Sequence, residues 1–129
     1  MFYEELYTEL GKLFYHLAAA DGKVQPAEKK TLHELILSKW KPLENSTDEF
    51  GTDLSNLIEF SFDYETSEVV TDDGLKSFEE FYKVNRENFT PAISNKIVET
   101  AGEIAEAYRG KNKEEQAFLH SLQKLLNKK

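Results

Sequence analysis

The chain has 129 residues and contains no cysteine. This absence excludes disulfide bonds, thiolate nucleophiles, iron–sulfur clusters and zinc sites built from cysteine. It fits a reducing compartment, in which disulfides are rare.

Signals for membrane insertion and secretion are also missing. The first residues, Met1-Phe2-Tyr3-Glu4-Glu5, lack the positive start and apolar stretch of a secretory signal. The longest uncharged, mostly apolar run nearby, residues 13–20, is far shorter than the roughly 20 residues that span a bilayer. We therefore expect no transmembrane segment and a cytoplasmic location.

The short motifs of common enzymes are absent as well. The sequence has no glycine-rich phosphate loop, no G-x-S-x-G motif and no His-x-x-x-His or His-Glu-x-x-His pair. His16, His33 and His120 fall on different expected helices, and the last two flank leucines of predicted buried stripes, as boundary residues do. Without a nucleophile–base pair or a cofactor motif, the sequence disfavours an enzyme and indicates no catalytic residue.

Negative charge exceeds positive charge, because 24 acidic and 16 basic residues give a net charge of -8. A chain of this charge repels nucleic acid and anionic lipid at long range, since both bind cationic surfaces. It suits cations, or a partner with basic patches. We therefore expect another protein with a basic surface as the partner, and no nucleic acid.

What is present is a globular composition with helical periodicity. Hydrophobic residues make up 40% of the chain and charged residues 31%, which is typical of a folded domain. Leucines recur every three or four positions between residues 2 and 20 and predict a first helix. Gly22 ends this helix, because glycine readily takes the left-handed conformation there. Pro26 begins a second helix that runs to about residue 40.

Four further helices follow. Ser46 or Thr47 caps the third, and Thr90-Pro91 starts the fifth. The expected inward residues of helices three to six are Phe50, Leu54, Leu57 and Ile58; Leu75, Phe78 and Tyr82, widened by Phe81 and Val84; Ile93, Ile97, Ala101, Ile104 and Tyr108; and Phe118, Leu122, Leu125 and Leu126.

Residues 63–73 are polar, and we expect an irregular solvated linker there. Its acidic positions lack the mid-loop glycine and terminal glutamate of a calcium loop. No segment shows the period-two alternation of a strand. The prediction is an all-α fold, a single compact bundle of about six helices over residues 1–129.

A weak internal repeat divides this bundle. Residues 32–35 read Leu-His-Glu-Leu and residues 119–122 read Leu-His-Ser-Leu. Aligning them brings Glu28 onto Glu115 and Gly22 near Gly110. This pattern predicts two weakly related helix–loop–helix halves.

The most distinctive segment is the hinge between the first two helices. It reads Ala20-Asp21-Gly22-Lys23-Val24-Gln25-Pro26-Ala27-Glu28 and leads into a leucine-rich helix. This pattern resembles the TerB-like (tellurite-resistance) superfamily, which includes the N-terminal domain of a DnaJ-type co-chaperone. The resemblance implies an all-helical, pseudo-two-fold bundle that binds divalent cations through acidic clusters or serves as an interaction module in stress responses. The second half departs from the pattern, since Arg109 stands where an acidic residue would precede glycine.

The hinge offers one candidate metal pair, Asp21 and Glu28. It also matches half of an EF-hand, but the first ligand positions would be Leu17 and Ala19, which cannot bind calcium. A structural interpretation stands beside the metal one, because Glu28 lies in a first helical turn, where the dipole favours it. Asp21 follows a helix C-terminus, where a negative charge is unfavourable, so a cation, a lysine or backbone N–H groups must compensate it.

Two functional hypotheses follow. The first is a non-enzymatic binding module with an acidic surface and one weak divalent-cation site at Asp21 and Glu28, acting in a metal or envelope stress response. The alternative is a metal-free protein–protein interaction domain in which these carboxylates only build the hinge. Two carboxylates alone bind a hard cation poorly, so the first hypothesis needs further oxygen ligands.

Overall fold

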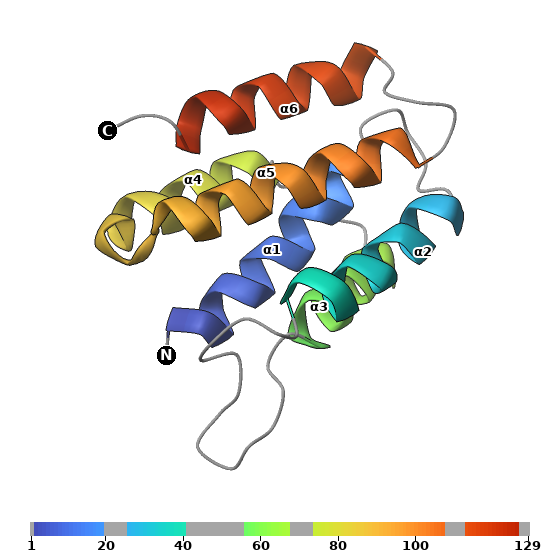
Figure 1. The fold of residues 1–129 in the computed structure, drawn as a ribbon, viewed down its shortest axis with the longest axis horizontal. Coiled ribbons are helices and arrows are strands. Elements are labelled where there is room, and N and C mark those ends of the chain that lie inside the picture. The colour runs from blue at the N-terminus through green and yellow to red at the C-terminus, as the bar shows by residue number, and fades with distance from the viewer. Residues whose placement is uncertain (1, 20–25, 41–55, 68–73, 108–112, 127–129) are drawn as a thin grey trace.

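The computed structural model describes residues 2–19, 26–40, 56–67, 74–107 and 113–126, and all of its regular elements are helical (Figure 1). The elements are α1 Phe2–Ala18, α2 Pro26–Leu35, the π-helix η1 Ile36–Trp40, α3 Asn56–Ser67, α4 Gly74–Val84, the 3₁₀ turn η2 Arg86–Asn88, α5 Pro91–Glu106 and α6 Lys113–Leu126. The predicted all-α fold of about six helices is confirmed. No helix in the described part of the chain is long and apolar enough to cross a bilayer.

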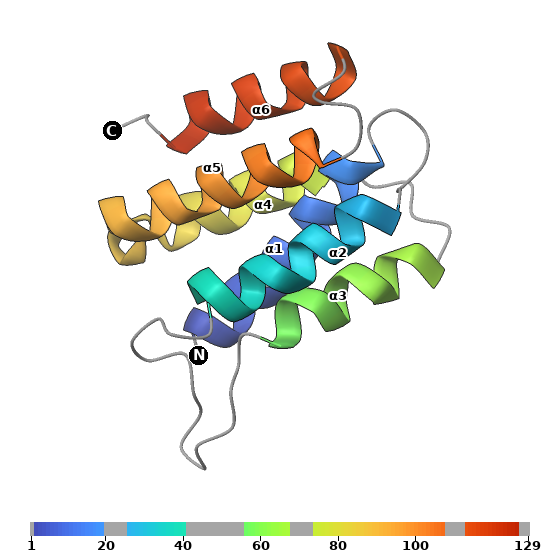
Figure 2. The same cartoon turned by 45° about the vertical axis from the view of Figure 1, so that its right-hand side comes forward.

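Helix α1 is the centre of the bundle. It contacts α3, α4, α5 and α6. In Figures 1 and 2, α6 packs on the outer side of α5, while α2 and α3 lie on the opposite side of the molecule. The predicted leucine stripe explains this position, because Leu6, Leu10, Leu13 and Leu17 are all fully buried. Burial of one such side chain contributes about 1.5–3 kcal/mol to folding.

Helices α1 and α3 lie in close backbone contact at Gly11. A Cβ atom on this glycine would overlap the Ile58 carbonyl oxygen and lie 2.5 Å from Ser61 Cβ and 2.9 Å from Phe62 N. Next to this contact, Ser61 Oγ donates a hydrogen bond to the Thr8 carbonyl at 2.7 Å. Glycine is therefore required here because the α3 backbone fills the space that a side chain would need.

The second predicted helix occupies the expected residues, but its last five form η1. Trp40 at its end is fully buried, and its Nε1 donates a hydrogen bond to Thr100 Oγ1 on α5 at 3.0 Å. Thr100 Oγ1 in turn donates to the Lys96 carbonyl at 2.7 Å. This chain of bonds joins η1 to the middle of α5.

The start of α5 confirms the local prediction. Thr90 is the N-cap, Pro91 follows at the first helical position, and Thr90 Oγ1 accepts a hydrogen bond from Ile93 N at 3.2 Å. The predicted stripe of α5 is buried at Ile93, Ile97, Ala101 and Ile104. In α6, Leu119 is buried as well as the three predicted leucines, and Phe118 is half-buried.

Two expectations were wrong. Residues 63–67 were expected to be irregular, but α3 continues to Ser67. An ion pair between Lys29 on α2 and Asp63 holds this part of α3, and Phe62 is buried beside it. Val84 was expected to widen the α4 stripe, but it is 84% exposed, because it is the last residue of its helix and the stripe stops at the buried Tyr82.

Several predictions fall outside the described residues. These are the hinge positions 20–25, the cap at Ser46 or Thr47, the inward residues Phe50 and Leu54, the linker residues 68–73, and Tyr108, Arg109 and Gly110. The resemblance between the two halves stays a prediction.

Candidate functional site

The predicted hinge site is described only at Glu28. This residue is the third of α2, two residues after Pro26, where the helix begins as predicted, and its side chain is 2% exposed. It is engaged in an interaction within the fold, and the N-terminal dipole of α2 favours its negative charge. Asp21 lies outside the described residues, so the predicted pair stays a prediction. In the described part of the chain, no three His, Asp or Glu side chains come together as a metal site.

The histidines lie on α1, α2 and α6, as the sequence predicts. His33 belongs to a charged cluster between α2 and α3, where its Nδ1 lies 2.8 Å from Glu59 Oε1. Lys29 completes this cluster by pairing with Asp63 and, at 3.2 Å, with Glu59 Oε2. The cluster links two helices at the surface, where such pairs contribute at most about 1 kcal/mol each.

Glu59 shows how this cluster is balanced. Burial opposes ionisation and raises the pKa of its carboxyl group, but the hydrogen bonds and positive charges of His33 and Lys29 together outweigh burial. The pKa of Glu59 therefore lies below its ordinary value of 4.5. The carboxylate stays charged and holds α3 against α2.

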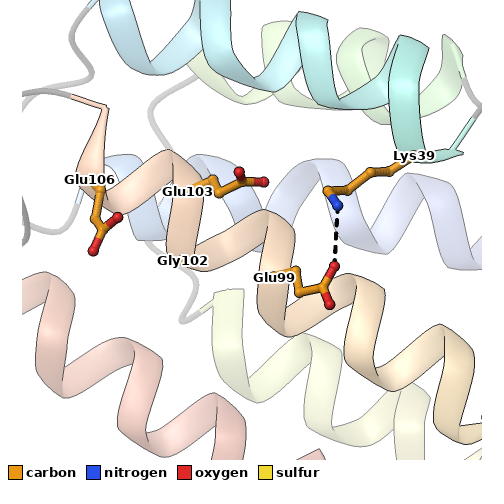
Figure 3. A pocket seen from close by; sticks show the side chains of 5 residues that line it. All are labelled: Lys39, Glu99, Gly102, Glu103 and Glu106. Carbon is orange, nitrogen blue, oxygen red and sulfur yellow. Dashed lines mark hydrogen bonds and ion pairs between the residues drawn. The ribbon is translucent and has the colours of Figure 1, made fainter.

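A different group of charged residues lines an open hollow between η1 and α5. The hollow has a volume of about 500 Å³, and its lining residues are Lys39, Glu99, Gly102, Glu103 and Glu106 (Figure 3). The glutamates recur at helical spacing on the face of α5 away from the buried isoleucines. We call this surface the α5 hollow.

Lys39 sets the geometry of the α5 hollow. Its Nζ lies 3.2 Å from Glu99 Oε2, and the two side chains are 32% and 59% exposed. Figure 3 shows the Glu103 carboxylate on the side of α5 that faces Lys39, and the Glu106 carboxylate at the other end, turned away. The carboxylates of Glu99 and Glu103 thus lie on the side of the Lys39 ammonium group, and Glu106 is engaged in an interaction within the fold. Carboxylates four residues apart on a helix repel each other by about 0.2–0.5 kcal/mol, so added positive charge is favourable here.

Gly102 keeps the floor of the α5 hollow open. It lies inside α5, yet a Cβ atom built on it would meet nothing within 4 Å among the described residues. Glycine inside a helix costs about 0.5–1 kcal/mol relative to alanine. The packing does not require this glycine, in contrast to Gly11, and its absent side chain gives a ligand room to approach the helix backbone.

The α5 hollow was not predicted from the sequence. The spacing of Glu99, Glu103 and Glu106 could have identified an acidic face on the fifth helix. The contribution of Lys39 could not have been foreseen, because it depends on how η1 packs against α5.

Comparison with known proteins identifies one family. The sequence model of the family described as tellurite resistance protein TerB matches residues 8–129. No curated protein and no solved structure matches the chain.

Proposed function

The chain belongs to the TerB family of tellurite resistance proteins, and on this premise we propose that it is a non-enzymatic binding module whose acidic surface receives a partner protein with a basic surface. The observation that supports this function is the α5 hollow. It combines three carboxylates with an open floor at Gly102. A lysine or arginine side chain of a partner fits this chemistry, since it can approach the α5 backbone over Gly102 and pair with Glu103.

Charge supports the same proposal over longer distances. A net charge of -8 attracts a basic partner and speeds association. The Debye length is about 30 Å at 0.01 M salt and about 8 Å at 0.15 M salt. Binding at the α5 hollow is therefore strongest at low ionic strength.

The cellular part of the proposal rests on the family. We propose that residues 1–129 form one TerB-like domain acting in the cytoplasm, in a metal or envelope stress response. Nucleic acid is not the proposed partner, because phosphates would meet the same carboxylates.

The experiment that tests this function compares two sets of substitutions with equal charge change. Glu99→Gln/Glu103→Gln/Glu106→Gln removes the charge of the α5 hollow. The matched control, Glu34→Gln/Glu80→Gln/Glu87→Gln, neutralises three exposed glutamates on α2, α4 and η2. The probe is a fluorescein-labelled oligolysine of about ten residues, with binding followed by anisotropy at about 0.01 M and 0.15 M salt.

We expect the hollow variant to bind the probe about tenfold more weakly than the control variant. Three charge contacts of roughly 0.5 kcal/mol each sum to about the 1.4 kcal/mol that corresponds to this factor. If both variants lose the same affinity, only net charge matters, and the α5 hollow is not the binding site.

A divalent-cation site at Asp21 and Glu28 is the second candidate. The observation that favours it is the burial of Glu28 in the first turn of α2, next to the hinge. A cation there would offset the cost of Asp21 after a helix C-terminus. Backbone carbonyl groups or water would have to supply the remaining oxygen ligands.

A further inference from the structure

Two hollows meet on the exposed side of α1. The first lies between α1 and α3, has a volume of about 320 Å³ and is lined by Thr8, Lys12, Leu57, Phe60, Ser61 and Tyr64. The second lies between α1 and α4, has a volume of about 250 Å³ and is lined by Glu4, Glu5, Thr8, Glu9 and Phe81. Thr8 lines both, so the two hollows adjoin at this residue, and we call them together the α1 groove.

The α3 half of the α1 groove is mostly apolar, and its one charged lining residue, Lys12, pairs with Glu9, whose Oε1 lies 3.9 Å from Lys12 Nζ. Phe60 and Tyr64 lie one helical turn apart on α3 and are 71% and 59% exposed, and Leu57 beside them is half-buried. The core does not require such exposed rings. Clustered exposed apolar side chains are typical of sites that another molecule covers.

The floor of this half is preformed. The contact between Gly11 and the α3 backbone, with the hydrogen bond from Ser61 Oγ to the Thr8 carbonyl, fixes the distance between α1 and α3. A ligand therefore meets a groove of fixed width, and little binding energy is lost in ordering it.

The α4 half of the α1 groove is acidic. Glu4 and Glu5 are exposed in the first turn of α1, where the helix dipole favours negative charge. Further along α1, the Ser77 hydroxyl group on α4 donates a hydrogen bond to the Glu9 carboxylate. The Ser77 oxygen lies 3.2 Å from Glu9 Oε1 and 3.0 Å from Glu9 Oε2. The exposed carboxylates at the end of the groove favour a cationic ligand.

The spacing of the two halves constrains the ligand. Glu4 lines the acidic half and Lys12 lines the α3 half. They are eight residues apart on α1, which is about 12 Å at 1.5 Å per residue. A ligand that covers both halves must carry apolar groups and positive charges about two helical turns apart. An amphipathic helix with lysine or arginine near one end meets this requirement.

We propose that the α1 groove binds an amphipathic helix of a basic partner protein. Aliphatic side chains of that helix pack on Phe60 and Tyr64, and its lysine or arginine side chains meet Glu4 and Glu5. Docking of a helix into an apolar groove is a common mode of recognition. The acidic half selects against acidic helices. The inference rests on the proposed function, because it adds a second surface for the same class of partner.

The test uses three labelled synthetic peptides of roughly 15 residues, a length that can form a helix. The first places leucines on one helical face and lysines on the other. The second replaces its leucines with glutamine, and the third replaces its lysines with glutamate. Anisotropy then separates apolar from charge-driven binding.

The protein variants are Phe60→Ser/Tyr64→Ser for the apolar half and Glu4→Gln/Glu5→Gln for the acidic half. Leu37→Ser is the matched control, since Leu37 is 47% exposed on η1 and lines neither hollow. Thermal melts verify that each variant is folded, which we expect because all these side chains are solvent-accessible.

We expect the wild type to bind the leucine–lysine peptide about tenfold more tightly than the glutamine–lysine peptide, a factor typical of one or two well-packed anchors. Phe60→Ser/Tyr64→Ser should abolish this preference, and Leu37→Ser should keep it. Glu4→Gln/Glu5→Gln should weaken binding of the leucine–lysine peptide and leave binding of the glutamine–lysine peptide, which does not dock in the α1 groove, close to that of the wild type. The glutamate peptide should not bind.

The inference is overturned if Phe60→Ser/Tyr64→Ser keeps the wild-type preference. It is also overturned if sedimentation shows a wild-type dimer that this variant abolishes, since a second copy of the chain would then occupy the groove. Failure here is distinguishable from failure of the proposed function. The affinity for the glutamine–lysine peptide measures binding at the α5 hollow. We expect this affinity to fall in the Glu99/Glu103/Glu106 variant whether or not Phe60 is replaced.

Discussion

Trp40 Nε1 donates a hydrogen bond to Thr100 Oγ1 at 3.0 Å, and the residues directly before them, Lys39 and Glu99, form an ion pair at 3.2 Å. On both η1 and α5, the residue that makes the exposed ion pair directly precedes the residue that makes the buried hydrogen bond. The buried bond joins η1 to α5, and the exposed pair forms the rim of the α5 hollow. The position of Lys39 therefore depends on the packing of its neighbour.

Thr100→Val tests this dependence. Valine matches the shape of threonine but leaves the indole N–H of Trp40 buried without its acceptor, which costs about 1–3 kcal/mol. Urea unfolding should show this loss. Thr100→Ser keeps the hydroxyl and should be closer to the wild type. Equal stability of the valine and wild-type proteins would contradict the role of the bond.

Gly11 and Gly102 form a matched pair for substitution. Gly11→Ala places a methyl group into the α3 backbone and should destabilise the fold by about 1–3 kcal/mol, as overpacking does. Gly102→Ala enters open space inside a helix and should stabilise the fold by about 0.5–1 kcal/mol. The same substitution should weaken oligolysine binding, because the methyl group occupies the floor of the α5 hollow. Thermal melts and anisotropy measure both effects, and a destabilised Gly102→Ala protein would contradict the open floor.

The pKa of Glu59 predicts a pH dependence of stability. Its folded-state pKa lies below the ordinary value of 4.5. The unfolded chain therefore binds this proton more readily, so the stabilisation is present above about pH 4.5 and is lost as the pH falls through the folded-state pKa.

The measurement is the difference in unfolding free energy between wild type and Glu59→Gln at several pH values. The groups that face Glu59 are Lys29 and His33, and Asp63 shares Lys29. We expect a difference below about 1 kcal/mol near neutral pH, as for exposed pairs, that shrinks in acid. Glu80→Gln on α4 is the control. If the difference in unfolding free energy grows as the pH falls, the pKa of Glu59 is not lowered in the folded state.

The helices illustrate what the sequence can predict. The leucine stripe of α1 and the Thr90-Pro91 start of α5 are local patterns, and both predictions were confirmed. The extension of α3 through Asp63 was missed, because its partner Lys29 lies 34 residues away in the chain. The polar composition of residues 63–67 indicated a linker, and a tertiary contact outweighed that preference.

The candidate sites show the same limit. Gly11 and Gly102 are the same residue type inside helices, yet one is filled by a neighbouring backbone and the other faces open space. Nothing in their local sequence distinguishes them. The hinge candidate stands out in the sequence because it is a contiguous pattern, and it stays a prediction, whereas the α5 hollow and the α1 groove form only when separate helices pack together.

The cation candidate predicts a specific thermal shift. Two charged ligands suggest an affinity at the weak end of calcium modules, with a dissociation constant of roughly 10⁻⁴–10⁻³ M. A concentration 100-fold above this value would stabilise the fold by about 2.7 kcal/mol. Melts with calcium or magnesium at matched ionic strength should show it for wild type and lose it in Asp21→Asn. Glu80→Gln is the charge-matched control and should respond like the wild type. If Asp21→Asn also responds like the wild type, the hinge carboxylates are structural, and the metal-free interaction domain is favoured.

A nuclear magnetic resonance titration of the ¹⁵N-labelled chain with oligolysine tests whether the α5 hollow is the binding site. If oligolysine binds at the α5 hollow, we expect the amide shifts to be concentrated on Lys39, Trp40 and residues 99–106 of α5. All of these amides should saturate over the same range of peptide concentration. Shifts spread evenly over all acidic helices, or absent from α5, would show that the α5 hollow is not the binding site.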